Sequence, residues 1–372
     1  MRKKLLALAT VGLLATATMT ACDDSDQSGD ASSGGSSGSG SGKARVGVIL
    51  PDTKSSTRWS TDDPKYLQQA FDAAGVPAEI VNAKGDRANF VKIGRDMVNS
   101  GVKVLIIANL DPDSGKQVLD YAHTKKIPTI DYDRLTLNGG ADYYVSFDNE
   151  GVGQLQAYGL VKCLKDKGIK NPVVAELNGS PTDNNATLFK AGYDFVLQPK
   201  YDSAEYTKGP DQWVPDWDSD EGVKIFQQMI DQQPNIDGVL SANDGLGGAA
   251  IKVLKKKGKN GKVPVTGQDA TLEGLQNLLT GDQCVTVYKA IRPEAQTAAK
   301  LAVQLFKGQK PAVRNQLKDP ESGAYIPFES LSPVSIDVTK INTVLKDGFA
   351  DKKKLCAGKY AALCAEHDVN VG

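Results

Sequence analysis

The sequence has few histidines, and its net charge is close to zero. Only two of its 372 residues are histidine, His123 within a predicted helix and His367 near the C-terminus. A Ser-His-Asp triad or a histidine zinc cluster therefore cannot be assembled in a shared cleft, and no cofactor or metal ion is expected. The 44 basic and 45 acidic residues leave a formal net charge of −1. This balance does not indicate nucleic acid or an acidic membrane surface as the main partner.

An apolar run near the N-terminus is typical of an export signal. A basic start (Arg2 to Lys4), an apolar core (Leu5 to Leu14) and small residues before Cys22 resemble a bacterial lipobox. Residues 1–21 are thus predicted to be a signal peptide, with Cys22 acylated as the mature N-terminus. The alternative is an ordinary signal peptide that leaves Cys22 in the tail of the exported protein.

Serine, glycine and aspartate dominate the segment that follows Cys22. Such a composition cannot bury an apolar core, and a flexible coil of this length spans roughly 25 Å root-mean-square. Residues 22–43 are therefore predicted to be a lipid-anchored tether. It would hold an extracytoplasmic body at the outer face of the bacterial cell membrane, with the lipid as the contact to the bilayer.

Cysteine is scarce beyond the tether, where four remain. Export permits disulfides. Cys356 and Cys364 lie close together in a short tail, and we predict that they are bonded. Cys163 and Cys284 would form the second pair, although two buried free thiols explain them equally well.

Short apolar strands and amphipathic helices alternate from Ala44 onward. Continuous apolar strands indicate parallel sheets covered by helices on both faces. The number of strand–helix units is too large for one sheet of usual width, so an α/β protein of two similar lobes is predicted. Strands are predicted at 45–51, 78–83, 102–108, 127–132, 143–147, 173–177, 237–243, 263–267 and 284–289. Helices are predicted at 59–75, 88–100, 116–126, 150–167, 186–197, 222–233, 246–257, 272–279 and 293–306.

Polar side chains follow the predicted strands. Parallel α/β sheets bind ligands beyond the carboxyl ends of their strands. Turn or helix-cap chemistry accounts for any one of these polar clusters. Their recurrence in both halves of the chain favours a shared polar cleft. The clusters begin at Asp52, Asp131, Ser146, Asp183, Asn243, Gln268 and Tyr288.

The groups in these clusters suit a neutral ligand that is rich in hydroxyls. Each sugar hydroxyl donates and accepts, so carboxylates and amides or cations satisfy it together. The C–H face of a pyranose stacks on a flat indole, for which Trp59 and Trp213 are candidates, core packing being the alternative for each. A glycosidase would need a carboxylic acid poised to give up its proton. Arginine and asparagine accompany the acids here and favour their ionised form.

Eight motifs resemble, in this order, those of the D-xylose-binding proteins of bacterial ABC sugar importers: TRW, YDR, SFDNE, GSPTDNNA, DQW, SANDG, GQDA and TVYK. Multiple-sugar-binding proteins share most of them, and the similarity covers about residues 44–355. The resemblance implies a type I periplasmic binding protein fold, with two Rossmann-like lobes and a three-segment hinge. It implies sugar contacts from Arg58, Asp133, Arg134, Asn185, Trp213, Asn243, Asp269 and Lys289, with Asn149 and Asp183 as neighbours.

The resemblance also implies where the lobes begin and end. The three crossings are expected near Phe147, Val287 and Ile326. The tail has no counterpart in the family. The N-terminal lobe is predicted at 44–146 plus 288–325, the C-terminal lobe at 147–287 plus 326–355, and the tail at 356–372.

The function implied by the resemblance is binding without catalysis. A monomeric protein would capture one monosaccharide, D-xylose above all, and deliver it to a membrane permease of an ABC transporter. DTKSSTRW is closer to the multiple-sugar-binding version of its motif, whereas GPDQWVPDW is closer to the xylose version. Glucose, galactose or arabinose as ligand, and a role as a sensory co-receptor, therefore stay open.

Overall fold

Strands and helices alternate along most of the chain in the computed structural model, which describes residues 44–370. The predicted signal peptide, the acylated Cys22 and the tether lie outside the described residues. Within residues 44–370, no helix is both long and apolar enough to cross a membrane.

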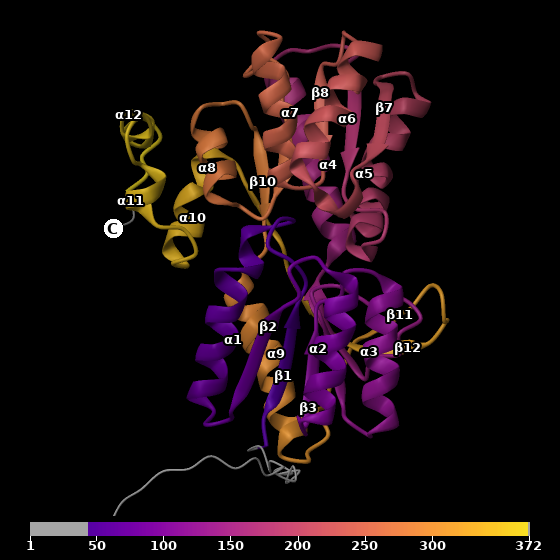
Figure 1. The fold of residues 1–372 in the computed structure, drawn as a ribbon. Coiled ribbons are helices and arrows are strands. Elements are labelled where there is room, and N and C mark those ends of the chain that lie inside the picture. The colour runs from indigo at the N-terminus through magenta and orange to yellow at the C-terminus, as the bar shows by residue number, and fades with distance from the viewer. Residues whose placement is uncertain (1–43, 371–372) are drawn as a thin grey trace, which may run out of the picture. The chain divides into compact units, whose positions relative to one another are not determined.

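A seven-stranded sheet forms the first lobe (Figure 1). Its order is β11-β12-β5-β4-β3-β1-β2, and its strands pair in parallel except for β11 with β12. Every residue of β1 is buried, because helices cover both faces of the sheet. The strands are β1 (Val46–Leu50), β2 (Ala78–Asn82), β3 (Val104–Ile107), β4 (Thr129–Tyr132), β5 (Tyr143–Phe147), β11 (Gln316–Lys318) and β12 (Tyr325–Leu331).

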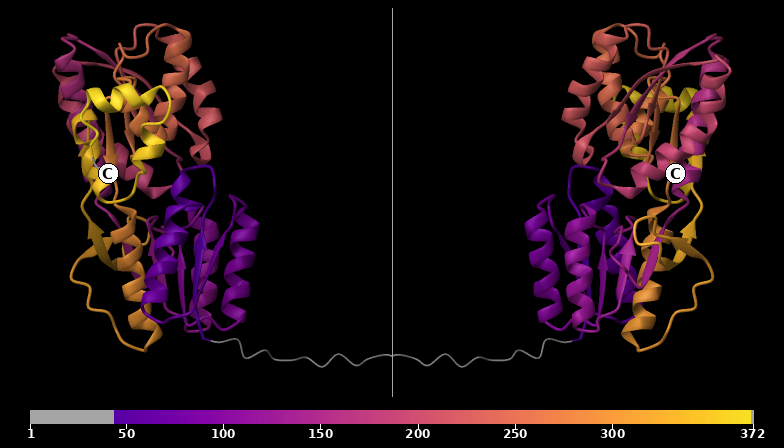
Figure 2. Two further views of the ribbon diagram at one scale, coloured as in Figure 1. Left: turned by 90° about the vertical axis from the view of Figure 1, so that its left-hand side faces the viewer. Right: turned by 90° about the vertical axis from the view of Figure 1, so that its right-hand side faces the viewer.

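Two helix pairs cover this sheet (Figure 2). Val46, Val48 and Leu50 of β1 pack with α1 (Asp62–Ala73) and α9 (Ile291–Phe306). On the other face, α2 (Arg87–Asn99) and α3 (Pro112–Thr124) pack in a second apolar cluster with Ile49. The alternation of side chains along β1 thus divides its apolar residues between two cores.

The second lobe repeats the strand order of the first. Its strands β7-β6-β8 and β13-β10-β9 form two small sheets that are linked by one parallel bridge between Val239 and Val265. The chain order second, first, third, fourth, fifth is therefore common to both lobes, as in doubly wound folds. The strands are β6 (Val173–Asn178), β7 (Thr207–Trp213), β8 (Gly238–Ser241), β9 (Thr266–Gln268), β10 (Val285–Tyr288) and β13 (Val334–Ile336).

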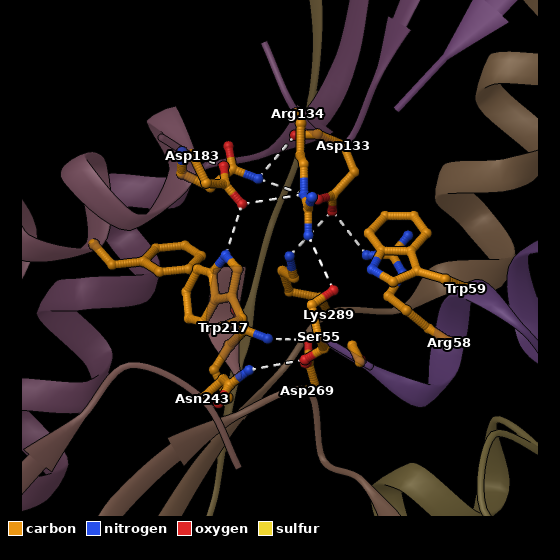
Figure 3. A pocket seen from close by; sticks show the side chains of 14 residues that line it. Ser55, Arg58, Trp59, Asp133, Arg134, Asp183, Trp217, Asn243, Asp269 and Lys289 are labelled. Carbon is orange, nitrogen blue, oxygen red and sulfur yellow. Dashed lines mark hydrogen bonds and ion pairs between the residues drawn. The ribbon is translucent and has the colours of Figure 1, made fainter. Parts of the chain in front are cut away.

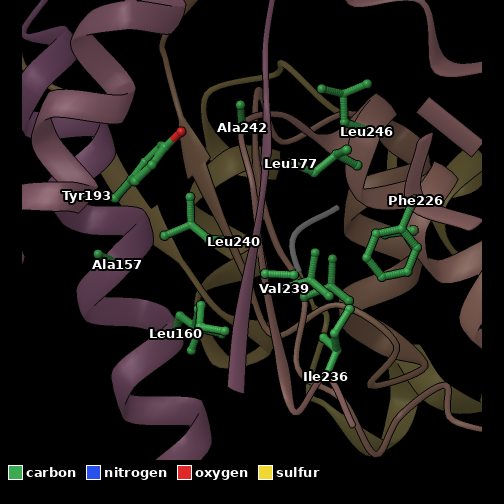
Figure 4. Close-up of a cluster of buried hydrophobic side chains, with 14 of the residues drawn as sticks. Ala157, Leu160, Leu177, Tyr193, Phe226, Ile236, Val239, Leu240, Ala242 and Leu246 are labelled. Carbon is green, nitrogen blue, oxygen red and sulfur yellow. The ribbon is translucent and has the colours of Figure 1, made fainter. Parts of the chain in front are cut away.

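Buried side chains from both faces of this sheet form the largest core (Figure 4). Leu160 and Tyr193 approach from one side and Phe226 from the other, all fully buried. Each such side chain stabilises the fold by roughly 1.5–3 kcal/mol relative to exposure. The helices of this lobe are α4 (Asn149–Asp166), α5 (Asn184–Asp202), α6 (Ser219–Gln232), α7 (Asp244–Lys256) and α8 (Leu272–Leu279).

Two glycines allow α4 and α5 to pack backbone against backbone. A Cβ atom on Gly153 would collide with the Phe189 carbonyl, and one on Gly192 would collide with the Glu150 carbonyl. Glycine is the residue that permits so close an approach. The first turn of α5 is thereby fixed beside the crossing from β5 to α4.

Several helices begin one to four residues earlier than the periodicity predicted, because aspartates that follow the strands cap them. The Asp111 side chain accepts from the Ser114 backbone N–H, and Pro112 occupies the first turn, so α3 begins four residues before the predicted Lys116. Asp148 and Asp218 cap α4 and α6 in the same way. Cap chemistry thus explains part of the polar pattern at the strand ends.

The chain crosses between the lobes at three places. The first two lie between β5 and α4 and between β10 and α9, close to the predicted Phe147 and Val287. The third follows Leu331 instead of lying near Ile326, because β12 pairs in parallel with β5 and β13 pairs with β10. The assignment of residues 326–331 to the second lobe was therefore wrong.

The tail packs on the second lobe and contains one of two disulfides. Leu355 and Val369 are buried in an apolar cluster that includes Leu275 and Leu278 of α8. Cys356 is bonded to Cys364, and Cys163 of α4 is bonded to Cys284 at the start of β10. Before the tail lie α10 (Ile341–Lys346) and α11 (Lys352–Leu355), and the tail itself contains α12 (Tyr360–Glu366).

Candidate functional site

A small cavity lies between the lobes, where the carboxyl ends of their strands face each other (Figure 3). Its empty space, including the part open to solvent, is at most about 310 Å³. We call it the inner cavity. Most of the residues predicted for a ligand site line it, and they come from both lobes. They are Arg58, Trp59, Asp133, Arg134, Asp183, Asn185, Asn243, Asp269 and Lys289.

Arg58 is the buried centre of an ion cluster in the first lobe. Its Nε and Nη2 donate to the two oxygens of Asp63, each at 2.7 Å, and Nη2 also donates to Glu294 Oε2 at 2.5 Å. The remaining nitrogen, Nη1, donates to Asp133 Oδ2 at 2.7 Å. Burial alone would lower the pKa of Arg58, but Asp63, Glu294 and Asp133 raise it well above its ordinary value. The guanidinium is thus fixed in position and charge.

Asp133 joins this cluster to the hinge and to the second lobe. Its Oδ2 also accepts from Lys289 Nζ at 3.1 Å, and Asn185 Nδ2 donates to its Oδ1 at 3.1 Å and to its backbone carbonyl at 3.0 Å. Burial opposes ionisation, but Lys289, Arg58 and Arg134 hold the pKa of Asp133 below its ordinary value. Asp133 is therefore ionised and acts as a hydrogen-bond acceptor, not as a general acid.

The backbone at Asp133 adopts a conformation that few residues other than glycine, asparagine and aspartate accept. Its φ is +61°, in the left-handed region. The hydroxyls of Tyr144 and Ser146 donate to its carbonyl oxygen at 2.9 and 2.7 Å and hold this turn. Strain of this kind occurs where surrounding contacts fix a functional side chain.

Two acids that support the site were missed by the sequence analysis. Asp63 and Glu294 are fully buried, and burial raises the pKa of both carboxyls despite their contact with Arg58. Asp63 lies in the first turn of α1 and Glu294 in α9, so neither follows a strand end. The signal that could have found them is an acid on the apolar face of an amphipathic helix.

In the second lobe, residues that cap helices also face the inner cavity. Asn243 Oδ1 accepts from the Leu246 backbone N–H, while its Nδ2 donates to the Ser55 carbonyl of the other lobe at 3.3 Å. Asp183 Oδ1 accepts from the backbone N–H of Asn185 at 2.9 Å. Helix capping and a place in the cavity lining are therefore not alternatives at these positions, because the same side chain does both.

Two ion pairs connect the lobes. Arg134 Nε lies 3.1 Å from Asp183 Oδ2, and Arg87 Nη2 lies 2.8 Å from Asp216 Oδ1. Together with the hydrogen bonds from Asn185 and Asn243, they hold the lobes against each other. The structure is thus a closed arrangement of the two lobes.

The indole that lines the inner cavity from the second lobe is Trp217, not the predicted Trp213. Trp213 is the last residue of β7 and pairs with Asn178 of β6, whereas Trp217 ends a short 3-10 helix (Pro215–Trp217) beyond the strand end. Trp217 is buried, and its Nε1 donates to Asp183 Oδ2 at 3.0 Å. Phe189 meets its ring edge-on, with centroids 6.4 Å apart. The rule that ligand groups follow strand ends would have selected Trp217.

Two further predicted residues have roles set by their neighbours. Trp59 lines the inner cavity, with the Arg58 and Arg134 guanidiniums 4.3 and 5.4 Å from its ring centroid. Its buried Nε1 has no hydrogen-bond partner among residues 44–370. Asn149 lies behind the lining, where its Nδ2 donates to Asn185 Oδ1 at 2.9 Å. Asn149 therefore orients Asn185.

The remaining charges come from the hinge and from the second lobe. Lys289 follows β10 in the hinge, and Asp269 lies between β9 and α8 of the second lobe with a φ of +99°. Burial raises the pKa of Asp269, although Lys289 and Arg58 counteract this. Gln268, which the sequence analysis did not single out as a contact, lines the inner cavity and donates to Asp269.

The arrangement provides paired donors and acceptors beside aromatic rings. A neutral ligand with many hydroxyls would satisfy such groups without leaving a buried charge unpaired. Within residues 44–370, no three histidine, cysteine, aspartate or glutamate side chains come close enough to hold a metal ion. Two α/β lobes that close on a polar cavity are typical of solute-binding proteins.

Comparison with known proteins gives the family. Residues 46–310 match the model of the periplasmic binding protein domain, and the chain belongs to this family. It is 35% identical over 319 residues to the D-xylose-binding periplasmic protein of Escherichia coli, which covers 84% of this chain and 93% of that protein. It is 34% identical over 321 residues to the multiple sugar-binding periplasmic receptor ChvE of Rhizobium radiobacter, covering 82% of this chain and 90% of that protein.

Solved structures show the same fold. A solute-binding protein of an ABC transporter from Clostridium phytofermentans, with bound β-D-glucose, has a TM-score of 0.76 and 27% identity. The match covers 83% of this chain and 99% of that one. The Caulobacter myo-inositol binding protein has a TM-score of 0.68 at 20% identity, covering 82% and 97% of the two chains. The predicted type I periplasmic binding protein fold is thereby confirmed.

The lowered pKa of Asp133 predicts how its contribution to stability depends on pH. Asp133→Asn should lower the free energy of unfolding by on the order of 3 kcal/mol at pH 7, because Arg58 and Lys289 lose a buried anionic partner. A carboxyl with a lowered pKa contributes fully above about pH 4, and its contribution falls as the pH drops further. Urea unfolding of both proteins should therefore give a constant difference from pH 7 to about pH 4, and a smaller one below.

Asp131, two residues away, is the matched control. Burial raises its pKa to about 7, so its contribution to stability should fall as the pH rises from about 4 to about 7. The difference between wild type and Asp131→Asn should thus change in the pH range where the Asp133 difference is constant. If the Asp133 difference instead grows as the pH falls from 7 to 5, the pKa of Asp133 is raised and not lowered.

Proposed function

We propose that this protein is an extracytoplasmic solute-binding protein that captures one monosaccharide, D-xylose above all, and delivers it to an ABC transporter permease. The observation that carries the proposal is the inner cavity, in which charged and amide side chains from both lobes converge beside Trp59 and Trp217. Relatives that are named for binding D-xylose or multiple sugars support the ligand class.

The energetics of a small sugar demand a lining of this kind. A pentose has about ten non-hydrogen atoms, and micromolar binding corresponds to about −8 kcal/mol. Each atom must then contribute about −0.8 kcal/mol, well above the roughly −0.3 kcal/mol per atom of drug-sized ligands. Every hydroxyl must find a partner and water must be excluded. The dense, buried set of donors and acceptors is suited to this demand.

Closure of the lobes links binding to delivery. Asn185 and Asn243 reach from the second lobe to Asp133 and Ser55 of the first, so the inner cavity is complete when the lobes meet. A ligand that contacts both walls favours the closed state over an open one. The permease would then recognise the closed form, and the binding protein itself performs no chemistry.

A second ligand class is another aldose. The multiple sugar-binding receptor ChvE aligns about as well as the D-xylose-binding proteins, and one related solute-binding protein holds β-D-glucose. Glucose, galactose or arabinose would use the same lining. A protein that imports the sugar and one that acts as a sensory co-receptor would both have to bind it in this cavity.

Isothermal titration calorimetry with a panel of aldoses tests the proposal. D-xylose should bind at a Kd of about 1 μM, and D-glucose, D-galactose and arabinose should bind at least about tenfold more weakly. Similar Kd values across the panel would identify a multiple-sugar protein instead. The absence of binding heat for every aldose, in protein shown to be folded by circular dichroism, would contradict the proposal.

The two neighbouring tryptophans give a matched pair for locating the ligand. Trp217→Phe should weaken D-xylose binding and reduce the ligand-induced change in tryptophan fluorescence, because this ring lines the inner cavity together with that of Trp59. Trp213→Phe should bind D-xylose as tightly as wild type and show the same ligand-induced fluorescence change, because Trp213 is part of β7. A fluorescence change that survives in Trp217→Phe and disappears in Trp213→Phe would reverse the assignment.

We further propose that the mature protein is anchored through Cys22 at the outer face of the cell membrane. The basic, apolar and small-residue segments before Cys22 support this, as does the Ser/Gly-rich stretch after it. In a bacterial host, wild type should fractionate with membranes and take up labelled palmitate. Cys22→Ser should lose the label and become soluble. A Cys22→Ser protein that still carries the label would refute the anchor.

A further inference from the structure

The end of α10 contacts the hinge at its second crossing, between β10 and α9. The Tyr288 hydroxyl at the end of β10 donates to Asp347 Oδ2 at 3.1 Å. The Tyr288 ring also lies beside that of Phe349, with centroids 5.2 Å apart. Tyr288 is buried, and none of these three residues lines the inner cavity. The contact thus joins a segment outside the ligand site to a strand of the hinge.

Phe349 packs against two apolar clusters, one in each lobe. The cluster of the first lobe contains Tyr66 of α1 and Ile291 of α9. The cluster of the second lobe contains Val344 of α10 and Tyr288. The Phe349 side chain is partly buried between them. A rotation of one lobe relative to the other therefore changes the surroundings of this ring.

The turn that ends α10 fixes the direction of Phe349. The Gly348 N–H donates to the Leu345 carbonyl at 2.9 Å, and the Phe349 N–H donates to the Val344 carbonyl at 3.3 Å. Gly348 has a φ of +67°, which completes a Schellman motif. A Cβ atom on Gly348 would lie 3.4 Å from Nη2 of Arg292 in the first turn of α9. The turn is therefore packed directly against the hinge.

The C-terminal tail holds α10 in this position. Cys364 and Val369 of the tail are buried in the same apolar cluster as α10. Asn342 of α10 donates through Nδ2 to the Asp368 carbonyl at 2.8 Å and accepts through Oδ1 from the Asn370 N–H at 3.1 Å. The disulfide within the tail limits its freedom when undocked, which favours docking.

We propose that residues 347–349, held in place by the tail, form a hinge brace that stabilises the closed arrangement and slows release of the ligand. The proposal rests on the proposed function and adds a control of release to it. Opening moves one lobe away from the other, so Phe349 loses part of its contact with one cluster. A contact that is stronger in the closed state raises the apparent affinity by the factor through which it shifts the equilibrium. Undocking of the tail would free the brace and favour release.

Phe349→Ala tests the brace in the full-length protein. Stopped-flow tryptophan fluorescence with D-xylose, or with D-glucose if wild type binds it more tightly, gives the rates of association and release. The release rate should rise at least about fivefold, and the association rate should stay within about twofold of wild type. The Kd from calorimetry should rise by the ratio of the two changes.

Phe306→Ala is the matched control for loss of stability. Phe306 is also partly buried and packs against the same cluster of the first lobe. It is the last residue of α9, so it lies about 22 Å along the helix from Ile291 at the hinge. Its replacement should lower the melting temperature as Phe349→Ala does and leave the release rate unchanged. An equal rise of the release rate in Phe306→Ala would assign the effect to lost stability and overturn the brace.

Val369→Asp tests the part played by the tail. A buried charge without a partner is unfavourable, so the tail should undock while the lobes stay folded. The release rate should rise as in Phe349→Ala. The double variant should release the ligand no faster than Phe349→Ala alone, because both changes remove the same contact. If Val369→Asp does not fold by circular dichroism, Asn342→Ala removes the two hydrogen bonds to the tail instead.

The outcomes separate the brace from the function on which it rests. If wild type binds an aldose and folded Phe349→Ala releases it no faster, the brace is overturned and the proposed function stands. Unchanged release from a variant with an undocked tail overturns the role of the tail. Absence of binding for every aldose in folded wild type overturns the proposed function and the brace with it.

Discussion

The structure of the site depends on the buried carboxylate of Asp133. It receives Arg58 from the end of β1, Lys289 from the hinge and Asn185 from the opposite lobe. Buried charges are costly to desolvate, and a hydrophobic replacement is often more stable. The role of this ion cluster is therefore to place side chains, and a gain in the stability of the fold does not explain it as well. It fixes three groups from distant parts of the chain in one geometry, and the inner cavity is built around them.

The repeated strand order explains why these groups can meet at all. Both lobes follow the same doubly wound order, so the carboxyl ends of two parallel sheets face each other across the crossings. Residues that cap helices at these ends then point into a common space. Asp183 and Asn243 each cap a helix and contact the opposite lobe. A turn residue and a functional residue are here the same side chain.

Prediction from sequence succeeded where one local rule governs the result. Continuous apolar runs gave the buried strands, and polar residues after them gave most of the cavity lining. Prediction from sequence failed where the position of a residue depends on which strand or side chain it pairs with. Trp213 and Trp217 are four residues apart with similar flanks, and only the pairing of β7 with β6 shows which indole lies beyond the strand. Asp63 and Glu294 were missed because neither follows a strand end. An acid on the apolar face of a helix is a local signal, but it does not show that Arg58 is the partner of both.

The sequence by itself determined the α/β class, the number of lobes and the residue types that gather at strand ends, because these follow from periodicity and local turn chemistry. Tertiary structure decided the exact crossing after Leu331, the pairing of Cys163 with Cys284, and the presence of Trp217 instead of Trp213 in the inner cavity. These features depend on contacts between residues that are far apart in the chain. Strand register, disulfide partners and the lining of a cavity are each set by pairs of residues in contact. The pattern of residue types along the sequence does not specify which residues pair.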